Sequence, residues 1–590
     1  MVLIIKHCGR LLIRDNVQRT CSVWSRTGRK QPARWRTDST ATKVITSNLP
    51  DVEIPSGLIY ENIWRNLERW PDREAVVCGV TNRKYTYFEL RSACKRFAAS
   101  LIKRGVDEGQ VIAILLPNIP EFAVCALGCN EAGIVVTTMN PLYTAYEIAH
   151  QLKDSGVVGV VTIDELLPRV LDAEKMIAAT EKKSFFNISI NLNGYRAEDA
   201  WDFFEMIDSS VDTSQFKSAT GPNNSLAFMP YSSGTTGLSK GVELSNKNIN
   251  SNLSQMTHPD IRHVVDTTPD YQDVLPAILP FYHIYGLTIL LCNGLLHGNK
   301  LISLPKLESE RFLSILKDDK PTVLYAVPPL ILLLGQNKRV TPSHFESLKV
   351  ICNGAGPVKE ADGEKILNKA KNKELRFLQA YGMTETSPLV FVTQNSDRNS
   401  YLTVGPPVSN TQARIVDPDD SSKLYGPGEV GEIQVRGPQV MLGYHNNPEA
   451  TASTIDSEGW LSTGDIGYYD ENDKFYISDR LKELIKVQGY QVPPAELEGL
   501  LRTHPKILDA AVVGVPHPRT GEAPLAFVVV NPDEPTPSAE DVQSFISTRV
   551  SPYKQITGGI QFVESLPKST AGKILRRLLK DEYMKKHKTA

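Results

Sequence analysis

The 590-residue chain has few cysteines and no long run of apolar residues. Its eight cysteines include no Cys-x-x-Cys pair, which disfavours zinc ribbons and disulfide scaffolds. Cys125 and Cys129 are expected to lie on one buried face of a helix. Because no stretch of about 18 apolar residues is present, a transmembrane segment is not expected.

An excess of either charge is also missing. The chain has 65 basic and 67 acidic residues and a net charge of −2, which argues against a dedicated nucleic-acid binder. Hydrophobic residues make up 41 % and charged residues 22 %, which excludes a disordered or collagen-like chain. A globular protein of this length is expected to have two or more domains.

The first 46 residues differ from the rest, with ten basic residues and only two acidic ones. They are rich in Arg, Ser and Thr, and residues 1–15 can form a short basic amphipathic helix. These features predict a mitochondrial transit peptide at 1–46, and a basic tail without a targeting role is the alternative. A peroxisomal or cytoplasmic location is the alternative to a mitochondrial one, although the ending KKHKTA does not match a peroxisomal SKL signal.

From residue 47 onward, β-rich runs alternate with helix-like stretches. Residues 111–116, 157–163 and 322–327 are expected to be buried strands, and residues 87–105 an amphipathic helix. This alternation predicts an α/β fold whose large N-terminal domain has layers of parallel α/β structure. Short strands between Gly and Pro turns predict a β-rich subdomain at about 403–478. The residues beyond 479 show the pattern helix, strand, strand, helix, which indicates a small α+β domain.

Residues 231–241, YSSGTTGLSKG, combine glycines, hydroxyl groups and a lysine. Glycine lets main-chain N–H groups converge on an anion, and hydroxyls add further donors. LAFMP before this loop can form a strand and LSNKNINSNLS after it a helix, the strand–loop–helix setting suited to phosphate. It is not a Walker A loop, because Ser239 stands where the second glycine of that pattern would be. These residues alone leave a phosphate site and a flexible surface turn both open.

Four later segments also carry chemically useful groups. They are YGMTET (381–386), STGD (462–465), DRLKELIKVQGYQV (479–492) and PKSTAGKILRR (567–577). They supply an aromatic ring beside a carboxylate, a carboxylate able to bind a ribose diol, and lysines beside glycines. Each alone could be a turn or a solvated charged face, but the ordered set is hard to obtain by accident.

This ordered set resembles the adenylate-forming superfamily of acyl-CoA synthetases, 4-coumarate–CoA ligases and beetle luciferases. The resemblance extends from about Ile54 to about Leu579, and PFYHIYGL (280–287) is most similar to the 4-coumarate–CoA ligase-like and fatty acyl-CoA ligase branch. It implies an AMP-forming acid–thiol ligase that uses ATP, Mg²⁺ and coenzyme A to convert a small carboxylic acid into an acyl-adenylate and then a thioester. It also implies an adenylation domain at 47–478, a hinge at 479–482 and a mobile C-terminal domain at 483–590.

The resemblance assigns roles to the residues that bind ATP. The phosphates would be held by Ser232, Ser233, Gly234, Thr235, Thr236, Gly237 and Lys240. Thr384 would contact phosphate and Glu385 would bind Mg²⁺ through a hard carboxylate oxygen. Tyr381 would stack on adenine with Gly382 beneath the ring, and Asp465 and Arg480 would hold the ribose.

The resemblance also assigns the residues that bind the acid and coenzyme A. Lys573 would bridge the carboxylate and the α-phosphate, Lys486 would serve thioester formation, and Lys482 would lie at the hinge. His283 would lie near the substrate carboxylate, although a lone histidine is more often structural. The pocket wall would comprise Tyr285, Gly286, Gly354, Ala355, Gly356 and Met383, and coenzyme A would contact Lys306 and Gly489.

Three positions depart from the family pattern. Ser239 replaces a frequent proline, Ala571 a frequent serine, and Gln488 a lysine that contacts coenzyme A.

The expected substrate is a medium- or long-chain fatty acid, and an aryl acid of the 4-coumarate type is the alternative. A luciferase-like oxygenase, an enzyme that loads a carrier protein and a non-catalytic adenylate-binding protein are less favoured. Peripheral membrane contact and oligomeric state stay open.

Overall fold

A computed structural model describes residues 44–590 except 180–184, 193, 195–196, 233–238, 359, 488–489, 548, 551, 569–573 and 588–590. The side chains of residues 480, 482, 490 and 491 are also left undescribed. Nearly all of the predicted transit peptide, residues 1–46, therefore lies outside the described residues. The fold is mixed α/β, with parallel sheets in a large N-terminal domain and a small C-terminal domain, as predicted.

The largest sheet has nine strands and a parallel centre. Its spatial order is β10–β11–β9–β5–β4–β6–β7–β8, and β20 pairs with β11. The strands are β4 (Val111–Leu115), β5 (Val135–Thr138), β6 (Gly159–Ile163), β7 (Phe186–Ile190), β8 (Trp201–Asp202), β9 (Leu226–Phe228), β10 (Tyr231–Ser232), β11 (Lys240–Ser245) and β20 (Gly443–Tyr444). Strands β4 to β9 are parallel, whereas β11 is antiparallel to β9 and β20. The strands expected at 111–116 and 157–163 are β4 and β6.

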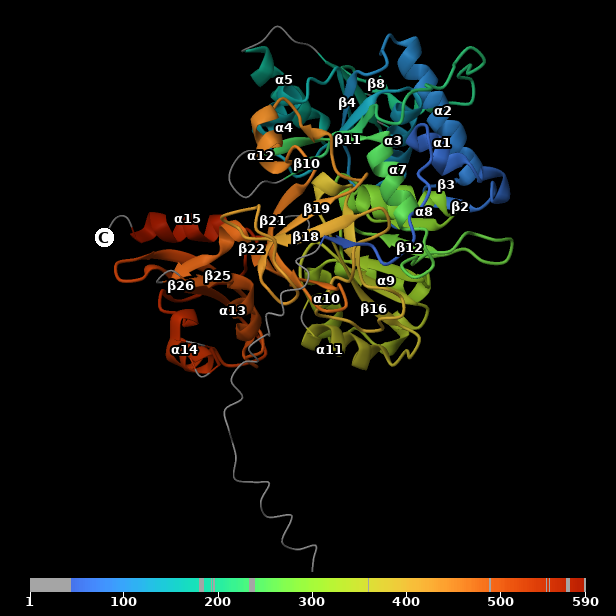
Figure 1. The fold of residues 1–590 in the computed structure, drawn as a ribbon. Coiled ribbons are helices and arrows are strands. Elements are labelled where there is room, and N and C mark those ends of the chain that lie inside the picture. The colour runs from blue at the N-terminus through green and yellow to red at the C-terminus, as the bar shows by residue number, and fades with distance from the viewer. Residues whose placement is uncertain are drawn as a thin grey trace, which may run out of the picture. The chain divides into compact units, whose positions relative to one another are not determined.

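Helices cover both faces of this sheet because its central strands are apolar on both sides. Ile112 and Ile114 of β4 pack with α2 and α3, whereas Ala113 and Leu115 pack with α4 and α5 (Figure 1). The helices are α1 (Ile59–Trp64), α2 (Tyr87–Lys103), α3 (Glu121–Glu131), α4 (Ala145–Asp154), α5 (Leu167–Ala178), α6 (Phe203–Ile207) and α7 (Asn246–Gln255). A parallel strand buried on both faces needs a continuous apolar run, which VIAIL provides.

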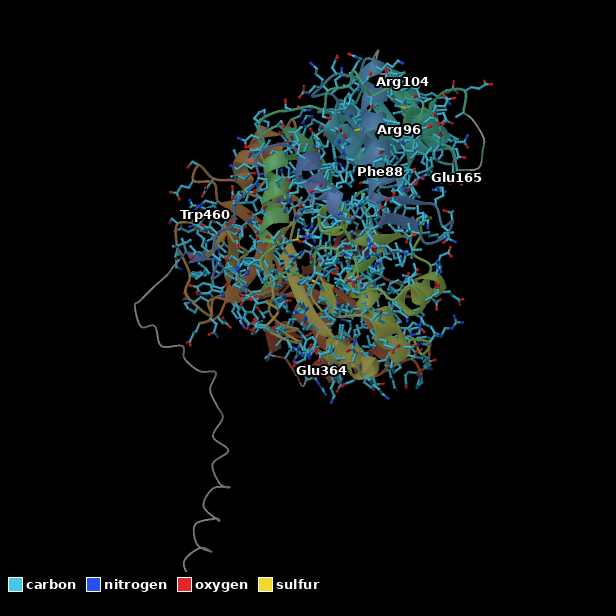
Figure 2. The ribbon with its side chains drawn as sticks, turned by 90° about the vertical axis from the view of Figure 1, so that its right-hand side faces the viewer. Phe88, Arg96, Arg104, Glu165, Glu364 and Trp460 are labelled. Atoms are coloured by element: carbon cyan, nitrogen blue, oxygen red, sulfur yellow. The ribbon has the colours of Figure 1, made fainter. Side chains whose placement is uncertain are left out.

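Helix α2 begins where the sequence predicts, because Thr86 caps it. The Thr86 hydroxyl accepts a hydrogen bond from the Glu89 N–H, and the Glu89 carboxylate accepts one from the Thr86 N–H. Phe88 and Arg96 lie on this helix and Arg104 follows its last residue (Figure 2).

Cys125 and Cys129 are both fully buried on α3, which confirms the expected buried face. Burial raises the pKa of the Cys129 thiol well above its ordinary value, so the thiol stays protonated. Among the described helices, none combines the length and the apolar content needed to cross a bilayer.

Two four-stranded sheets follow the orders β12–β13–β2–β3 and β14–β15–β16–β17. The strands are β2 (Glu74–Cys78), β3 (Lys84–Thr86), β12 (Val274–Ala277), β13 (Lys300–Ser303), β14 (Val323–Ala326), β15 (Val350–Asn353), β16 (Arg376–Gly382) and β17 (Leu389–Val392). Strand β14, expected at 322–327, alternates between two cores. Val323 and Tyr325 face the main core, and Leu324 and Ala326 face helices α9 (Ser309–Asp318), α10 (Pro328–Gln336) and α11 (Glu360–Ala370).

The expected β-rich subdomain is an antiparallel sheet of order β1–β18–β19–β21–β22. Its strands are β1 (Ile45–Thr46), β18 (Gln412–Val416), β19 (Gly431–Arg436), β21 (Leu461–Tyr469) and β22 (Phe475–Arg480), with α12 (Pro448–Thr454) between β20 and β21. Strand β1 enters from the N-terminal side, where Ile45 pairs with Ala413. The last two residues of the predicted 1–46 segment therefore belong to the fold.

The C-terminal domain is a five-stranded sheet between helices. The order is β24–β23–β26–β25, with β27 beside β26. The elements are β23 (Ile485–Val487), β24 (Tyr490–Val492), α13 (Pro494–Leu501), β25 (Ile507–His517), β26 (Gly521–Val530), α14 (Ala539–Ser547), β27 (Gly559–Phe562) and α15 (Arg576–His587). Ala510 and Val512 pack toward α13 and α14, and Ala511 and Val513 toward α15 (Figure 1). The expected order helix, strand, strand, helix is confirmed by α13, β25, β26 and α14.

Candidate active site

The predicted phosphate loop is the tip of a β-hairpin. Strands β10 and β11 pair with Tyr231 opposite Gly241 and Ser232 opposite Lys240. The tip itself, which carries the predicted Ser233, Gly234, Thr235, Thr236 and Gly237, lies outside the described residues. The hairpin base places Ser232 and Lys240 side by side.

The strand and the helix expected on either side of the loop are β9 and α7, but a further strand, β11, separates the loop from the helix. The six residues of β11 lie between the loop and α7, and the Ser245 hydroxyl accepts a hydrogen bond from the Asn248 N–H at the start of that helix. The segment extends because β9 pairs with one edge of β11 and β20 with the other. The dipole of α7 acts only near its own first turn, and β11 separates that turn from the predicted phosphate loop.

Tyr231 attaches the base of the hairpin to α4. Its hydroxyl donates a 2.6 Å hydrogen bond to Asp154 Oδ2, and the Asn446 side-chain amide donates to the Asp154 carbonyl at 3.2 Å. Burial and the bond to Asp154 raise the pKa of Tyr231, so this hydroxyl stays a donor. The loop therefore begins from a fixed strand end.

Lys240 and Glu385 are brought together by Tyr444. The Lys240 ammonium lies 4.8 Å from the centre of the Tyr444 ring, and the Tyr444 hydroxyl donates a 2.9 Å hydrogen bond to Glu385 Oε1. Burial, followed by the effect of Glu385, raises the pKa of Tyr444. Tyr444 could not be predicted from the sequence, because it approaches β11 through the pairing of Val242 with Tyr444, which no local pattern indicates.

Glu385 can contribute to a Mg²⁺ site but cannot form one alone. It is 6 % exposed, lies in the short 3₁₀ turn Thr384–Thr386, and its carbonyl accepts a hydrogen bond from the Met441 N–H at 2.9 Å. Among the described residues, no group of three or more His, Cys, Asp or Glu is placed to hold a metal ion. One carboxylate fits Mg²⁺ whose remaining ligands are phosphate oxygens and water.

Tyr381 and Asp465 also meet, although they lie in different sheets. The Tyr381 hydroxyl donates a 2.6 Å hydrogen bond to Asp465 Oδ2, and Asp465 is 6 % exposed. The neighbouring Gly382 has no room for a side chain, since a Cβ there would lie 1.9 Å from the Pro388 carbonyl oxygen. Asp465 pairs across β21 and β22 with Arg480, so the predicted ribose pair is adjacent in the backbone.

His283 precedes an eight-residue π-helix, Tyr285–Cys292. The His283 Nδ1 accepts a hydrogen bond from the Tyr285 N–H at 3.2 Å, which leaves the proton of the neutral ring on Nε2. A Cβ on Gly286 would lie 2.1 Å from the Pro280 carbonyl oxygen, so only glycine fits the start of this helix. The sequence does not indicate a π-helix, a form that often occurs at functional sites.

The small residues of NGAGP, predicted to line the acid pocket, have close neighbours. A Cβ on Gly354 would lie 2.9 Å from the Tyr285 ring, and one on Gly356 would lie 3.2 Å from Pro328 Cγ. The Tyr285 hydroxyl also donates a hydrogen bond to the Cys352 carbonyl at 3.2 Å. The Tyr285 ring therefore fills the space beside Gly354.

The remaining predicted residues of this region lie around the same strand ends. Ala355 has a φ of +65° and is exposed, and Met383 and Thr384 are half-buried after β16. Lys306 is exposed beyond β13. The positive φ at Ala355 turns the chain sharply after Gly354 and keeps NGAGP close to Tyr285.

The two predicted catalytic lysines belong to the C-terminal domain. Lys486 is exposed on β23 between buried Ile485 and Val487, and its N–H donates to Glu522 Oε2 at 2.9 Å. Lys573 and Gly489 lie outside the described residues, as do the side chains of Arg480 and Lys482.

Arg576, which the sequence analysis did not select, joins three parts of the C-terminal domain. Its Nε and one terminal nitrogen each lie 2.8 Å from the Glu498 carboxylate of α13, and it also bonds Glu483 beside the hinge. Burial alone would lower the pKa of Arg576, but the two carboxylates outweigh it and raise the pKa. Arg576 is the first residue of α15, so these contacts fix the start of that helix.

Comparisons with known proteins agree with this fold. Residues 63–445 match the AMP-binding enzyme family and residues 496–573 the AMP-binding enzyme C-terminal domain. The chain is 36 % identical to 4-coumarate–CoA ligase 1 of Arabidopsis thaliana over 91 % of this chain and 95 % of that protein. It is 37 % identical to 4-coumarate–CoA ligase 2 of Oryza sativa subsp. japonica over 92 % and 95 %.

Solved structures with the same fold include ATP-bound MatB from Rhodopseudomonas palustris, with a TM-score of 0.79, 27 % identity and coverage of 89 % of this chain and 98 % of that one. A benzoate CoA ligase from Burkholderia xenovorans matches with a TM-score of 0.78, 24 % identity and coverage of 89 % and 99 %, which shows the fold alone.

The chain therefore belongs to the AMP-binding enzyme family, the adenylate-forming superfamily that its motifs resemble. Within that family it is an ATP-dependent, AMP-forming carboxylate–CoA ligase. Its small-molecule partners are a carboxylic acid, ATP with Mg²⁺, and coenzyme A.

Proposed function

We propose that this ligase activates a compact aryl acid rather than a medium- or long-chain fatty acid. The observation that carries the proposal is the Tyr285 ring, which fills the space beside Gly354 in the predicted pocket wall. The relatives named 4-coumarate–CoA ligase, 36 to 37 % identical over nine-tenths of the chain, support the aryl alternative. A flat ring stacks against an aromatic side chain, and such contacts favour an aryl acid over a flexible tail.

In the first step, the acid carboxylate attacks the α-phosphate of ATP and pyrophosphate leaves. The Lys240 ammonium and the hairpin N–H groups bind the phosphates, and Glu385 would hold Mg²⁺ against their oxygens. Bound Mg²⁺ supplies positive charge where two anions meet. The acid carboxylate lies beside His283, whose Nδ1 accepts a hydrogen bond from the Tyr285 N–H.

Adenosine recognition depends on Tyr381 and Asp465. The Tyr381 ring provides a flat face for adenine, and its hydroxyl fixes Asp465 Oδ2 at 2.6 Å. Asp465 accepts hydrogen bonds from the ribose diol, an interaction strengthened by its burial at 6 % exposure. Thr384, one residue before Glu385, adds a hydroxyl for phosphate.

In the second step, the thiol sulfur of coenzyme A attacks the acyl carbonyl and AMP leaves. Lys573 serves the first step and Lys486 the second, so the C-terminal domain presents two different faces to one site. Rotation about Lys482 exchanges these faces, which makes domain movement a gate on turnover. Lys306 and Gly489 contact coenzyme A, and Gln488 provides a neutral contact where relatives have a lysine.

A competition experiment tests the aryl proposal. Protein lacking residues 1–43 is mixed with ATP, Mg²⁺, coenzyme A and equal amounts of 4-coumarate, benzoate and fatty acids from short to long, and the thioesters are identified by mass spectrometry. We expect an aryl-CoA product to dominate. A dominant fatty acyl-CoA product would refute the aryl proposal but retain the ligase reaction, whereas release of AMP without a thioester would indicate another acceptor.

We also propose that residues 1–46 direct the protein to mitochondria, on the strength of their ten basic and two acidic residues. The full chain tagged at its C-terminus is expected to colocalise with a mitochondrial marker. Protein that begins at residue 44 keeps strand β1 and is expected to lose this location. Identical locations for the two proteins would contradict the targeting proposal.

A further inference from the structure

A small cavity beside Tyr285 has no place in the roles assigned above. Its volume is about 30 Å³, and its walls come from the π-helix, the end of α7 and strands β14 to β17. Most of the wall is apolar, including Ile289, Leu389 and Val392. Because Tyr285 lines this cavity and is also a predicted wall residue of the acid pocket, the cavity adjoins the proposed acid pocket.

Two polar side chains interrupt the apolar wall. Asn293, at the junction of the π-helix with helix α8 (Asn293–Leu296), is 2 % exposed. Its side-chain Oδ1 and the Nε2 of His263 are both shielded from solvent, and neither has a hydrogen-bond partner among the described residues. Buried polar atoms without partners are costly, so a cavity lined by two of them indicates a polar occupant.

The occupant must be small and neutral. Burial, and to a lesser degree the positive charge of Arg376, lowers the pKa of His263 to about 3, so the ring is uncharged at neutral pH. A cavity of about 30 Å³ holds one hydroxyl or water, for which about 10–15 Å³ suffices. A methyl group in this position would leave both polar atoms unpaired.

We infer that Asn293 and His263 bind a hydroxyl group at the far end of the acid. The hydroxyl donates a hydrogen bond to Asn293 Oδ1 and makes a second hydrogen bond with His263 Nε2. When the acid has no hydroxyl at this end, a water molecule occupies the cavity and makes the same hydrogen bonds. This inference rests on the proposed function for the location of the acid, but it holds for an aryl or an aliphatic acid.

The test compares acids that differ by one hydroxyl. The kcat/KM values are measured for 4-coumarate against cinnamate and for 10-hydroxydecanoate against decanoate. In the pair that the enzyme uses, we expect kcat/KM to be at least about tenfold higher for the hydroxylated acid than for the plain acid. In Asn293→Leu, the ratio of these two kcat/KM values is expected to fall to about one. His263→Phe is expected to lower the same ratio.

Thr288→Val is the matched control. Thr288 lies on the same π-helix and its buried hydroxyl also lacks a partner among the described residues, but it does not line the cavity. The ratio is expected to be unchanged in this variant. A ratio unaffected by Asn293→Leu, or a change shared equally by both acids of a pair, would assign the cavity to a resident water and overturn the inference. If only 10-hydroxydecanoate and decanoate are converted, the aryl proposal is refuted, but the ratio for that pair still tests the hydroxyl-binding inference.

Discussion

Lys573→Ala is expected to lower the rate of adenylate formation by about 10³-fold or more, because the charge that joins two anions is lost. The same variant, supplied with synthetic acyl-adenylate, is expected to form the thioester at a nearly normal rate. Lys486→Ala should show the opposite pattern, with normal pyrophosphate release and slow thioester formation. The exposed position of Lys486 between buried Ile485 and Val487 makes this substitution compatible with an intact domain.

Each half-reaction is measured separately, by pyrophosphate release in single turnover and by thioester formation from the supplied adenylate. Lys586→Ala is the matched control, since Lys586 is exposed on α15 and pairs with Glu582, four residues earlier, at 2.8 Å. It should change neither rate. Equal loss of both half-reactions in Lys573→Ala would show that Lys573 is not specific to the first step. Normal thioester formation in Lys486→Ala would remove Lys486 from the second.

Glu385→Gln is expected to reduce adenylate formation by about 10²- to 10³-fold and to raise the Mg²⁺ concentration needed for half-maximal rate. Glutamine keeps an oxygen that accepts the Tyr444 hydrogen bond, so the local packing is retained while the charge is lost. Pyrophosphate release measured across a Mg²⁺ titration gives both quantities.

Tyr444→Phe keeps the charge of the Glu385 carboxylate but removes the hydrogen bond that positions it. The ring facing Lys240 is retained and only the hydrogen bond to Glu385 is removed, so a loss of about tenfold in the rate of adenylate formation is expected.

A Mg²⁺ dependence in Glu385→Gln equal to that of the unsubstituted protein would contradict the metal role of Glu385.

The elements that could be predicted are those whose pattern is local. Strand β4 is a continuous apolar run because both its faces are buried, and α2 has a capping box that marks its first residue. The C-terminal helices and strands follow for the same reason. The family motifs likewise located Tyr381 and Asp465, which the structure joins by a hydrogen bond.

The elements that could not be predicted depend on distant partners. Strand β11 was expected to be loop and helix, and it extends because β9 and β20 flank it. The π-helix at Tyr285–Cys292 is mostly apolar, and nothing in YGLTILLC distinguishes it from an α-helix. Tyr444 and Arg576 act through partners that only the folded chain brings near.

The pairing of Ile45 with Ala413 has a consequence for the newly made chain. Strand β1 leaves the ribosome early, but β18 follows only after roughly twenty to seventy seconds of synthesis at ordinary elongation rates. Until then the N-terminal segment has no partner in its sheet and is open to chaperones, proteases or import receptors. The N-terminal end of the chain is therefore exposed first, and it is held in its sheet only after β18 has been made.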